Sequence, residues 1–268
     1  MEENIFENMH DLDILGNRDQ CGTPLIQTRG YWLPPVIVQD WLRTYNMAIR
    51  SDDVIVASSP KSGTHWLFYV VYLLKTNNFG AIPRHQQRPL LEAPRSDDEF
   101  QALIQQKEPR ILATHMPAAL LAKHAFKAKI VYIYRNPKDV VTSLYFHYKN
   151  FIVWPFNKTF EEFVDIFLEG DTIWGPHWKH VKSYHDLKQQ GPNEQSQQLL
   201  LVKYEDLKKD TKAMIRKIGD FLQNNNLTSD FIDQIDEAVS IGKMRNNKDA
   251  NGQIWRSVCL PNLIFISY

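Results

Sequence analysis

Apolar residues follow two patterns along the chain, short continuous runs and longer segments with polar interruptions. Four short runs are rich in Val, Ile and Leu and are bounded by polar residues or turns, which predicts buried strands. They span residues 53–58, 110–114, 129–134 and 198–204. Near-continuous apolar strands are typical of a parallel sheet covered by helices on both faces. The fold prediction is a single α/β domain with a central parallel sheet.

The segments around these strands predict helices. Asn136 caps one of them, with Pro137 at its first position, and Asp206 caps another. The expected helices span residues 36–50, 64–75, 137–149, 160–168, 178–187, 207–223 and 229–239. Residues 77–97 hold three prolines and predict a long irregular connection after the first helix.

Composition and charge narrow the class of protein. The chain has 268 residues, is 43% hydrophobic and carries no formal net charge, so neither nucleic acid nor a membrane is an expected partner. Cys21 and Cys259 lie far apart, which favours a reducing compartment over a disulfide framework. The acidic N-terminus lacks a signal core, and the apolar run 66–74 is too short to cross a bilayer. The expected location is cytoplasmic.

Residues 53–75 predict a strand, a tight loop of small residues and a helix, in the P-loop-like order that holds a phosphate. Free N–H groups and the dipole at the helix start favour an anion, and Lys61 adds a positive charge. The hydroxyls of Ser62 and Thr64 add donors. The loop is not a Walker A motif, because its lysine precedes the only glycine. From the loop alone, a plain turn made by Gly63 is an equal alternative.

Polar residues stand at the carboxyl ends of all four predicted strands. They are Lys61, His115, Arg135 and Tyr204. Ligands of open α/β sheets bind outside these ends, so the four side chains are candidates for one site. His115 titrates near neutral pH and is a candidate general base, although a lone histidine is also common as a structural residue.

Four motifs together resemble the cytosolic sulfotransferase family, which uses 3′-phosphoadenosine 5′-phosphosulfate as donor. P-K-S-G-T-x-W at 60–66 resembles its 5′-phosphosulfate loop, and R-N-x-K-D-x-x-x-S at 135–143 its second signature. T-H-x-P at 114–117 resembles the catalytic motif, and Y-E-D-L at 204–207 a nucleotide-contacting segment. The resemblance spans about Tyr31 to Met244.

The resemblance implies sulfuryl transfer to a hydroxyl or amine of a small hydrophobic acceptor, without a metal. His115 would be the general base, and Lys61 would stabilise charge on the bridging oxygen. Arg135 and Ser143 would bind the 3′-phosphate, and Trp66 would stack on adenine. The other residues assigned to the donor are Ser62, Gly63, Thr64, His65, Tyr204, Ser240 and Met244. Candidates for the acceptor pocket are Leu90, Leu91, Phe151 and Trp154, each of which suits plain core or loop packing equally well.

Four positions depart from the family pattern. Ser59 stands where an aromatic residue is common, and His65 replaces a threonine of the loop. Ala113 stands where many members carry a lysine. Ile241 replaces an aromatic residue that would face Trp66 across adenine, which predicts a one-sided stack.

The C-terminal sequence differs most from the family. The R-K-G-x-x-G-D-W segment and the K-x-x-x-T-V-x-x-x-E dimer motif beyond it are absent. We therefore expect a loosely ordered lead-in at 1–30, a sulfotransferase domain at 31–248 and an atypical tail at 249–268, with the oligomeric state open. The alternative function is a catalytically impaired, nucleotide-binding truncated or splice product. A nucleotide kinase is disfavoured, because the lysine is misplaced and no magnesium-binding carboxylates stand out.

Overall fold

Four parallel strands form the centre of the computed structural model, which describes residues 25–83, 86–87, 89–93, 96–107, 110–121, 123–150, 156–191 and 193–249. The strands are β3 (Val54–Ser58), β4 (Ile111–Thr114), β5 (Lys129–Tyr134) and β6 (Leu199–Lys203). Their order in the sheet is β4-β3-β5-β6, and all three pairings are parallel. The predicted α/β fold with a central parallel sheet is confirmed.

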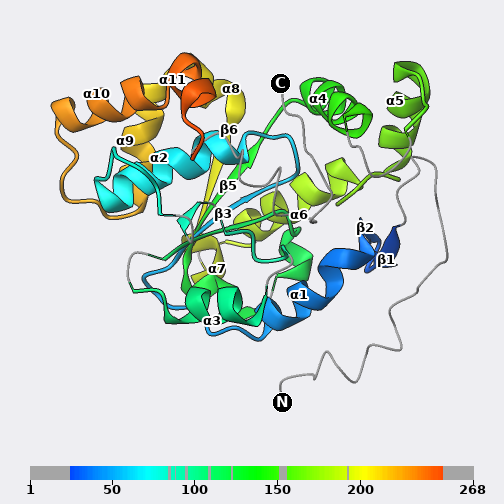
Figure 1. The fold of residues 1–268 in the computed structure, drawn as a ribbon, viewed down its shortest axis with the longest axis horizontal. Helices are drawn as coiled ribbons and strands as arrows, with labels where there is room; N and C mark the ends of the chain where they lie inside the picture. The colour runs from blue at the N-terminus through cyan, green and yellow to red at the C-terminus, as the bar shows by residue number, and fades with distance from the viewer. Residues whose placement is uncertain are drawn as a thin grey trace.

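Helices cover both faces of this sheet (Figure 1). One face packs against α2 (Thr64–Thr76), α9 (Thr211–Phe221) and α10 (Ser229–Ala238), and the other against α3 (Asp97–Gln105) and α6 (His177–Gln189). Alternate residues of each strand enter the two cores: Val54 and Val56 of β3 join the first, and Ile55 and Ala57 join the second. Burial on both faces explains why the strands are almost continuously apolar.

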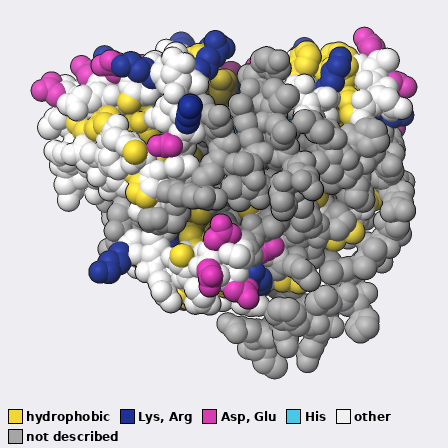
Figure 2. Space-filling model, viewed as in Figure 1, with side chains coloured by type: hydrophobic (Ala, Val, Ile, Leu, Met, Phe, Trp, Pro, Cys, Tyr) yellow, Lys and Arg dark blue, Asp and Glu magenta, His cyan; other side chains and the backbone are white. Residues whose placement is uncertain are grey.

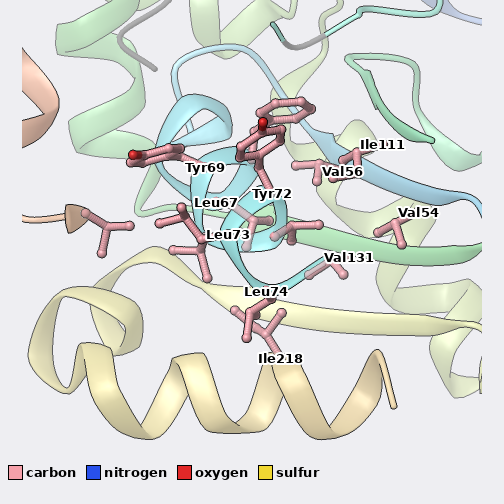
Figure 3. Packing of buried hydrophobic residues seen from close by; sticks show 14 of the residues in the cluster. Val54, Val56, Leu67, Tyr69, Tyr72, Leu73, Leu74, Ile111, Val131 and Ile218 are labelled. Atoms are coloured by element: carbon pink, nitrogen blue, oxygen red, sulfur yellow. The ribbon is translucent and has the colours of Figure 1, made fainter. Parts of the chain in front are cut away.

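The helix α2 packs against both the sheet and α9 and is apolar on most sides. Figure 3 shows Leu67, Leu73 and Leu74 of α2 packed among Val131 of the sheet and Ile218 of α9. Each fully buried aliphatic side chain contributes about 1.5–3 kcal/mol relative to exposure. This packing anchors the helix whose first turn follows the Lys61 loop.

The remaining elements form the N-terminal and peripheral parts of the domain. β1 (Ile26–Thr28) and β2 (Tyr31–Leu33) pair antiparallel, so residues 26–28 of the expected lead-in form a strand. The helices α4 (Pro137–Lys149) and α5 (Phe160–Glu169) pack on each other through a third apolar cluster. The short elements are η3 (Ala118–Leu120), η4 (Lys123–Lys127) and α7 (Glu194–Gln197).

Two helix predictions were wrong in their extent. The helix expected at 36–50 is α1 (Pro35–Tyr45) and ends earlier. The helix expected at 207–223 is interrupted: α8 (Tyr204–Lys209) contains Asp206, and α9 begins after Asp210. Asp210 has non-helical dihedrals and accepts the N–H of Ala213 at 3.0 Å, so it is the cap in place of Asp206.

Among the described residues, the α-helices α3, α7 and α11 were not predicted. Ser96 and Glu99 form a capping box at the start of α3, after the proline-rich connection. The helix α11 (Ile241–Asn246) follows α10. Among the described residues, every helix is too short or too polar to cross a bilayer.

A buried ion pair ties together the amino ends of β3 and β4. Arg110 Nε donates to Asp53 Oδ1 at 2.7 Å, and the two side chains are 1% and 0% exposed. Arg110 Nη2 also donates to the carbonyl of Ala48 at 2.8 Å. These hydrogen bonds offset much of the cost of burying the charges. The opposite, carboxyl ends of the same strands carry the candidate site.

Candidate active site

The four predicted side chains lie at the ends of four neighbouring strands. Along the sheet they run His115 after β4, Lys61 after β3, Arg135 after β5 and Tyr204 after β6. Arg135 Nη1 donates to the carbonyl of Lys61 at 3.4 Å, and its guanidinium carbon lies 4.4 Å from the Tyr204 ring centroid. The strand ends therefore form one continuous row of functional groups.

The loop between β3 and α2 has the geometry of an anion cradle. Lys61 and Gly63 have positive φ values of 66° and 108°, and α2 starts without a side-chain cap. Ser62 is fully buried, and its Oγ has no hydrogen-bond partner in the part of the chain that the structure describes. An uncapped helix start and an unsatisfied buried hydroxyl both fit a bound phosphate or sulfate oxygen.

Gly63 is required by its surroundings. A Cβ at this position would lie 2.7 Å from the Tyr204 ring, and the positive φ disfavours any side chain. Beside it, Thr64 Oγ1 and Ser58 Oγ are 2.6 Å apart, a hydrogen bond that closes the loop. His65 follows in the first turn of α2 and is half-buried.

Arg135 lies between β5 and α4, just before the cap of this helix, and Ser143 lies in its second turn. Asn136 caps this helix by accepting the N–H of Lys138 at 3.0 Å. Arg135 Nη2 lies 3.5 Å from Asp139, whereas its Nε is buried and unpartnered within the described residues. The guanidinium thus retains a donor for an additional anion.

Trp66 lies at a cavity of about 470 Å³ that also takes its lining from Val239, Ser240 and Ile241. The rings of Trp66 and Tyr204 meet edge to face, with centroids 5.4 Å apart. Met244 packs against the apolar core beside them and does not line this cavity. Trp66 is therefore a candidate stacking surface for a flat aromatic ligand.

The cavity wall also carries two basic and three acidic side chains. Its charged residues are Lys208, Lys212, Asp233, Asp236 and Glu237. Lys212 Nζ lies 3.0 Å from Asp233, and Asp233 raises the pKa of this lysine. Figure 2 shows basic and acidic side chains interspersed over this region.

His115 is buried and held in one tautomer. Its Nδ1 lies 2.9 Å from the carbonyl oxygen of Ser58, which can only accept, so Nδ1 carries the proton. The basic lone pair is then on Nε2. The ring meets Trp174 edge to face, with centroids 5.5 Å apart. This tautomer suits a general base acting through Nε2.

Sequence comparison assigns the family. The sulfotransferase domain family matches residues 51–257. Mouse sulfotransferase 1A1 is 32% identical over 236 residues, which cover 85% of this chain and 79% of that protein. The chain belongs to the sulfotransferase family. Human sulfotransferase 2A1 is 33% identical over 211 residues, covering 76% of this sulfotransferase and 70% of the human protein.

Solved structures agree with this assignment. The crystal structure of mouse sulfotransferase SULT7A1 complexed with PAP superposes with a TM-score of 0.70 at 27% identity, covering 83% of this chain and 76% of that chain. An Arabidopsis thaliana putative steroid sulphotransferase shares the fold, with a TM-score of 0.69 at 24% identity and 97% coverage of both chains. The predicted family and the predicted enzyme class are therefore confirmed.

Of the expected acceptor residues, the two that the structure describes are buried in the cores. Leu90 and Leu91 are 8% and 7% exposed and belong to the two cores on either face of the sheet. Phe151 and Trp154 lie outside the described residues. In this sulfotransferase, Trp174 contacts His115, and the sequence had pointed only to its segment, residues 170–178, as scaffold near the acceptor site.

A second histidine lies near the candidate base. Burial, and to a lesser extent electrostatic interaction with Lys61 and His115, lowers the pKa of His147, on α4, from 6.5 to about 3. His147 is therefore neutral at pH 7. Its position one turn after Ser143 was the only sequence signal, and that spacing alone names no function.

Two departures from the family pattern have structural consequences. Ser59 Oγ lies 2.9 Å from Nδ1 of the buried His177, so a hydrogen bond stands where an aromatic residue is common. Ala113 is fully buried in the first core. Sequence reasoning noted Ser59 but missed His177, because the two are far apart in the chain.

Proposed function

We propose that this sulfotransferase transfers a sulfuryl group from 3′-phosphoadenosine 5′-phosphosulfate to a hydroxyl or amine of a small hydrophobic acceptor. One observation carries the proposal: an anion cradle with Lys61 and a tautomerically fixed His115 follow adjacent strands. The proposed catalytic domain spans 31–248, with a lead-in at 1–30 and a tail at 249–268. A cytoplasmic location is part of the proposal.

The residues present fit the donor. Ser62, Thr64 and the backbone N–H groups after Gly63 would hold the 5′-phosphosulfate, with His65 contributing its backbone N–H. Arg135, with its unpartnered Nε, would bind the 3′-phosphate together with Ser143. Trp66, Tyr204 and Ser240 would surround the adenine, and Met244 would support them from the core. Lysine, arginine and backbone amides supply the positive charge, so we propose a metal-free reaction.

His115 and Lys61 would share the chemistry. His115 Nε2 takes the proton of the acceptor hydroxyl or amine while the acceptor atom bonds to sulfur. Lys61 stabilises the charge on the bridging oxygen as the bond from sulfur to that oxygen breaks. The co-substrate supplies the sulfuryl group and leaves as 3′-phosphoadenosine 5′-phosphate. Alignment and charge stabilisation supply most of the catalysis in group transfers of this kind.

The acceptor class rests on the resemblance and on the surroundings of the base. The Trp174 ring against His115 offers an apolar surface to a ring-bearing alcohol, phenol or amine. A screen of such compounds with sulfur-labelled donor is the direct measurement of acceptor class.

A second candidate function is nucleotide binding with impaired transfer. Ile241 is 53% exposed at the cavity and offers no ring opposite Trp66, which weakens the adenine site. Micromolar or tighter calorimetric binding of 3′-phosphoadenosine 5′-phosphate, unmatched by ATP, is expected for either candidate.

The variant His115→Ala separates the two candidates. An active enzyme should lose transfer of labelled sulfur on this substitution and keep its nucleotide affinity. Wild-type protein that binds the nucleotide but transfers no label to any acceptor would support the impaired form. Retained transfer by His115→Ala would refute the proposed base.

A further inference from the structure

A buried polar cluster lies beneath the candidate site, on the α6 face of the sheet. Tyr132 of β5 and His180 and Tyr184 of α6 are fully buried. The rings of Tyr132 and Tyr184 stack with centroids 3.8 Å apart, and the ring of His180 stacks on Tyr132 at 5.7 Å. Burying a polar group in a core is costly unless its hydrogen bonds are satisfied. The hydrogen-bond partners of these side chains therefore indicate which segments the cluster holds in place.

The hydrogen bonds of this cluster link the segment before the Lys61 loop to the backbone of His115. The backbone of Ser59 hydrogen-bonds the hydroxyl of Tyr132, and that hydroxyl lies 3.0 Å from Nδ1 of His180. Nε2 of His180 lies 2.8 Å from the carbonyl oxygen of His115 and must donate to it. The series therefore runs from the N–H of Ser59 through Tyr132 and His180 to the backbone of His115.

One neutral form of His180 satisfies every contact in the series. Because Nε2 donates to a carbonyl, Nδ1 carries the lone pair that accepts the tyrosine hydroxyl. Burial lowers the pKa of His180 to about 3, which keeps this neutral form at physiological pH. The series is thus complete under the conditions in which the enzyme works.

The two ends of the series lie just past the last paired residues of β3 and β4. The ladder between β3 and β4 has its last pair at Ala57 and Thr114. Ser59, which precedes the Lys61 loop, and His115 both follow that last pair. Contacts beyond strand pairing therefore also act on their separation, and one of them is the hydrogen bond from His115 Nδ1 to the carbonyl of Ser58 at 2.9 Å.

The helix α6 contacts the donor loop a second time. His177 Nδ1 lies 2.9 Å from Ser59 Oγ, and His177 stands one turn before His180 on the same side of the helix. One rigid helix thus contacts the donor loop through His177 and the base through His180.

We propose that Tyr132 and His180 are positioning residues that set the distance and orientation between the Lys61 loop and His115. The inference rests on the proposed function, because it assigns them an effect on transfer through His115. Neither side chain touches the reacting atoms. A misplacement of about 1 Å between a nucleophile's base and its target can cost roughly 100-fold in rate, so small displacements are measurable.

The test is Tyr132→Phe, which removes one hydroxyl and keeps the stacked ring. The turnover number should fall roughly 10- to 100-fold. The Kd for 3′-phosphoadenosine 5′-phosphate should stay within about twofold, since no nucleotide contact changes. The matched control is Tyr72→Phe, which removes a buried hydroxyl that accepts from Asn78 at 2.9 Å in the last turns of α2. Equal turnover in the two variants, or a parallel loss of nucleotide affinity in Tyr132→Phe, would overturn the inference.

A second pair of variants tests the inference if Tyr132→Phe does not fold. His180→Gln keeps an N–H donor for the carbonyl of His115, and His180→Leu does not. The glutamine variant should turn over at least about fivefold faster than the leucine variant. Equal turnover would again overturn the inference. His115→Ala distinguishes this result from the parent proposal: retained transfer there refutes the base itself, whatever the Tyr132 and His180 variants do.

Discussion

The Glu92 carboxylate holds the backbone of His115. Oε1 of Glu92 accepts the N–H of His115 at 2.6 Å, and Oε2 accepts the hydroxyl of Thr114 at 2.9 Å. Thr114 Oγ1 in turn accepts the N–H of Met116 at 3.0 Å. Glu92 is only 1% exposed and comes from the segment that extends the sheet beside β4. Its carboxylate therefore fixes the turn that presents the imidazole.

Replacing Glu92 should impair turnover through His115. In Glu92→Gln one carboxylate oxygen becomes an amide NH₂ group, which cannot accept a hydrogen bond from the neighbouring donor. The turn therefore loses at least one hydrogen bond. We expect roughly 10-fold lower turnover and about 1–3 kcal/mol lower free energy of unfolding. Kinetics and denaturant titration measure both effects on the same preparation.

Asp53→Asn is the matched control for a buried carboxylate. Asp53 pairs with Arg110 at the opposite end of β3, far from His115 along the strands. The Asp53→Asn variant should lose about 3–5 kcal/mol in its free energy of unfolding, with normal turnover per folded molecule. Normal turnover in Glu92→Gln as well would show that the Glu92 contacts do not position the base.

Gly63→Ala should disable the donor loop. The new Cβ would lie 2.7 Å from Tyr204, at a φ of 108° that disfavours side chains. Strain of about 1–3 kcal/mol follows, and relief by loop movement would spoil the anion cradle. Calorimetry should show at least roughly 10-fold weaker binding of 3′-phosphoadenosine 5′-phosphate.

Gly242→Ala serves as the control for this substitution. Gly242 lies in α11 with open space around its Cβ position. Alanine there should leave nucleotide affinity unchanged and add a few tenths of a kcal/mol to about 1 kcal/mol of stability. Equal affinity in both variants would mean that the loop does not contact the nucleotide.

Acid should destabilise the fold through two histidines of α6. Burial lowers the pKa of His180 from 6.5 to about 3 and that of His177 from 6.5 to about 4. The unfolded chain therefore binds more protons than the folded chain between these values, so stability falls as pH drops below about 6.5. At pH 5 each histidine should lower the free energy of unfolding by about 2 kcal/mol relative to its value at pH 7.

Denaturant titration at pH 7 and pH 5 measures this loss. The variant His180→Gln should show a difference between the two pH values that is smaller by about 2 kcal/mol. A wild-type free energy of unfolding that is the same at both pH values would refute the neutral, buried state of these histidines.

The sequence predicted those features of the site that local pattern encodes. The Lys61 loop and the strand end before Arg135 are continuous segments, and the carboxyl ends of parallel strands meet at one edge by geometry. Glu92 was missed because it acts from an irregular connection, whose path depends on tertiary packing. His177 and His180 were missed because their partners, Ser59 and His115, lie 118 and 65 residues away in sequence, respectively. Periodicity places such residues on a helix face but does not say what that face meets.

The adenine site should improve when a ring is restored opposite Trp66. Ile241, at the first position of α11, lines the same cavity and is 53% exposed, so a larger side chain has room. Stacking on an aromatic side chain is worth about 1–3 kcal/mol per base. Because position 241 is partly exposed to solvent, we expect a gain at the low end of this range. Ile241→Phe should tighten 3′-phosphoadenosine 5′-phosphate binding by about 1 kcal/mol, roughly fivefold.

Ile241→Leu separates stacking from added apolar surface. The leucine variant should bind the nucleotide as the wild type does, because it adds no ring. In a Trp66→Ala background the gain from phenylalanine should shrink, since the base is then held on one side only. Equal affinities for the phenylalanine and leucine variants would mean that adenine does not lie between positions 66 and 241, and the nucleotide would have to be placed elsewhere along the strand ends.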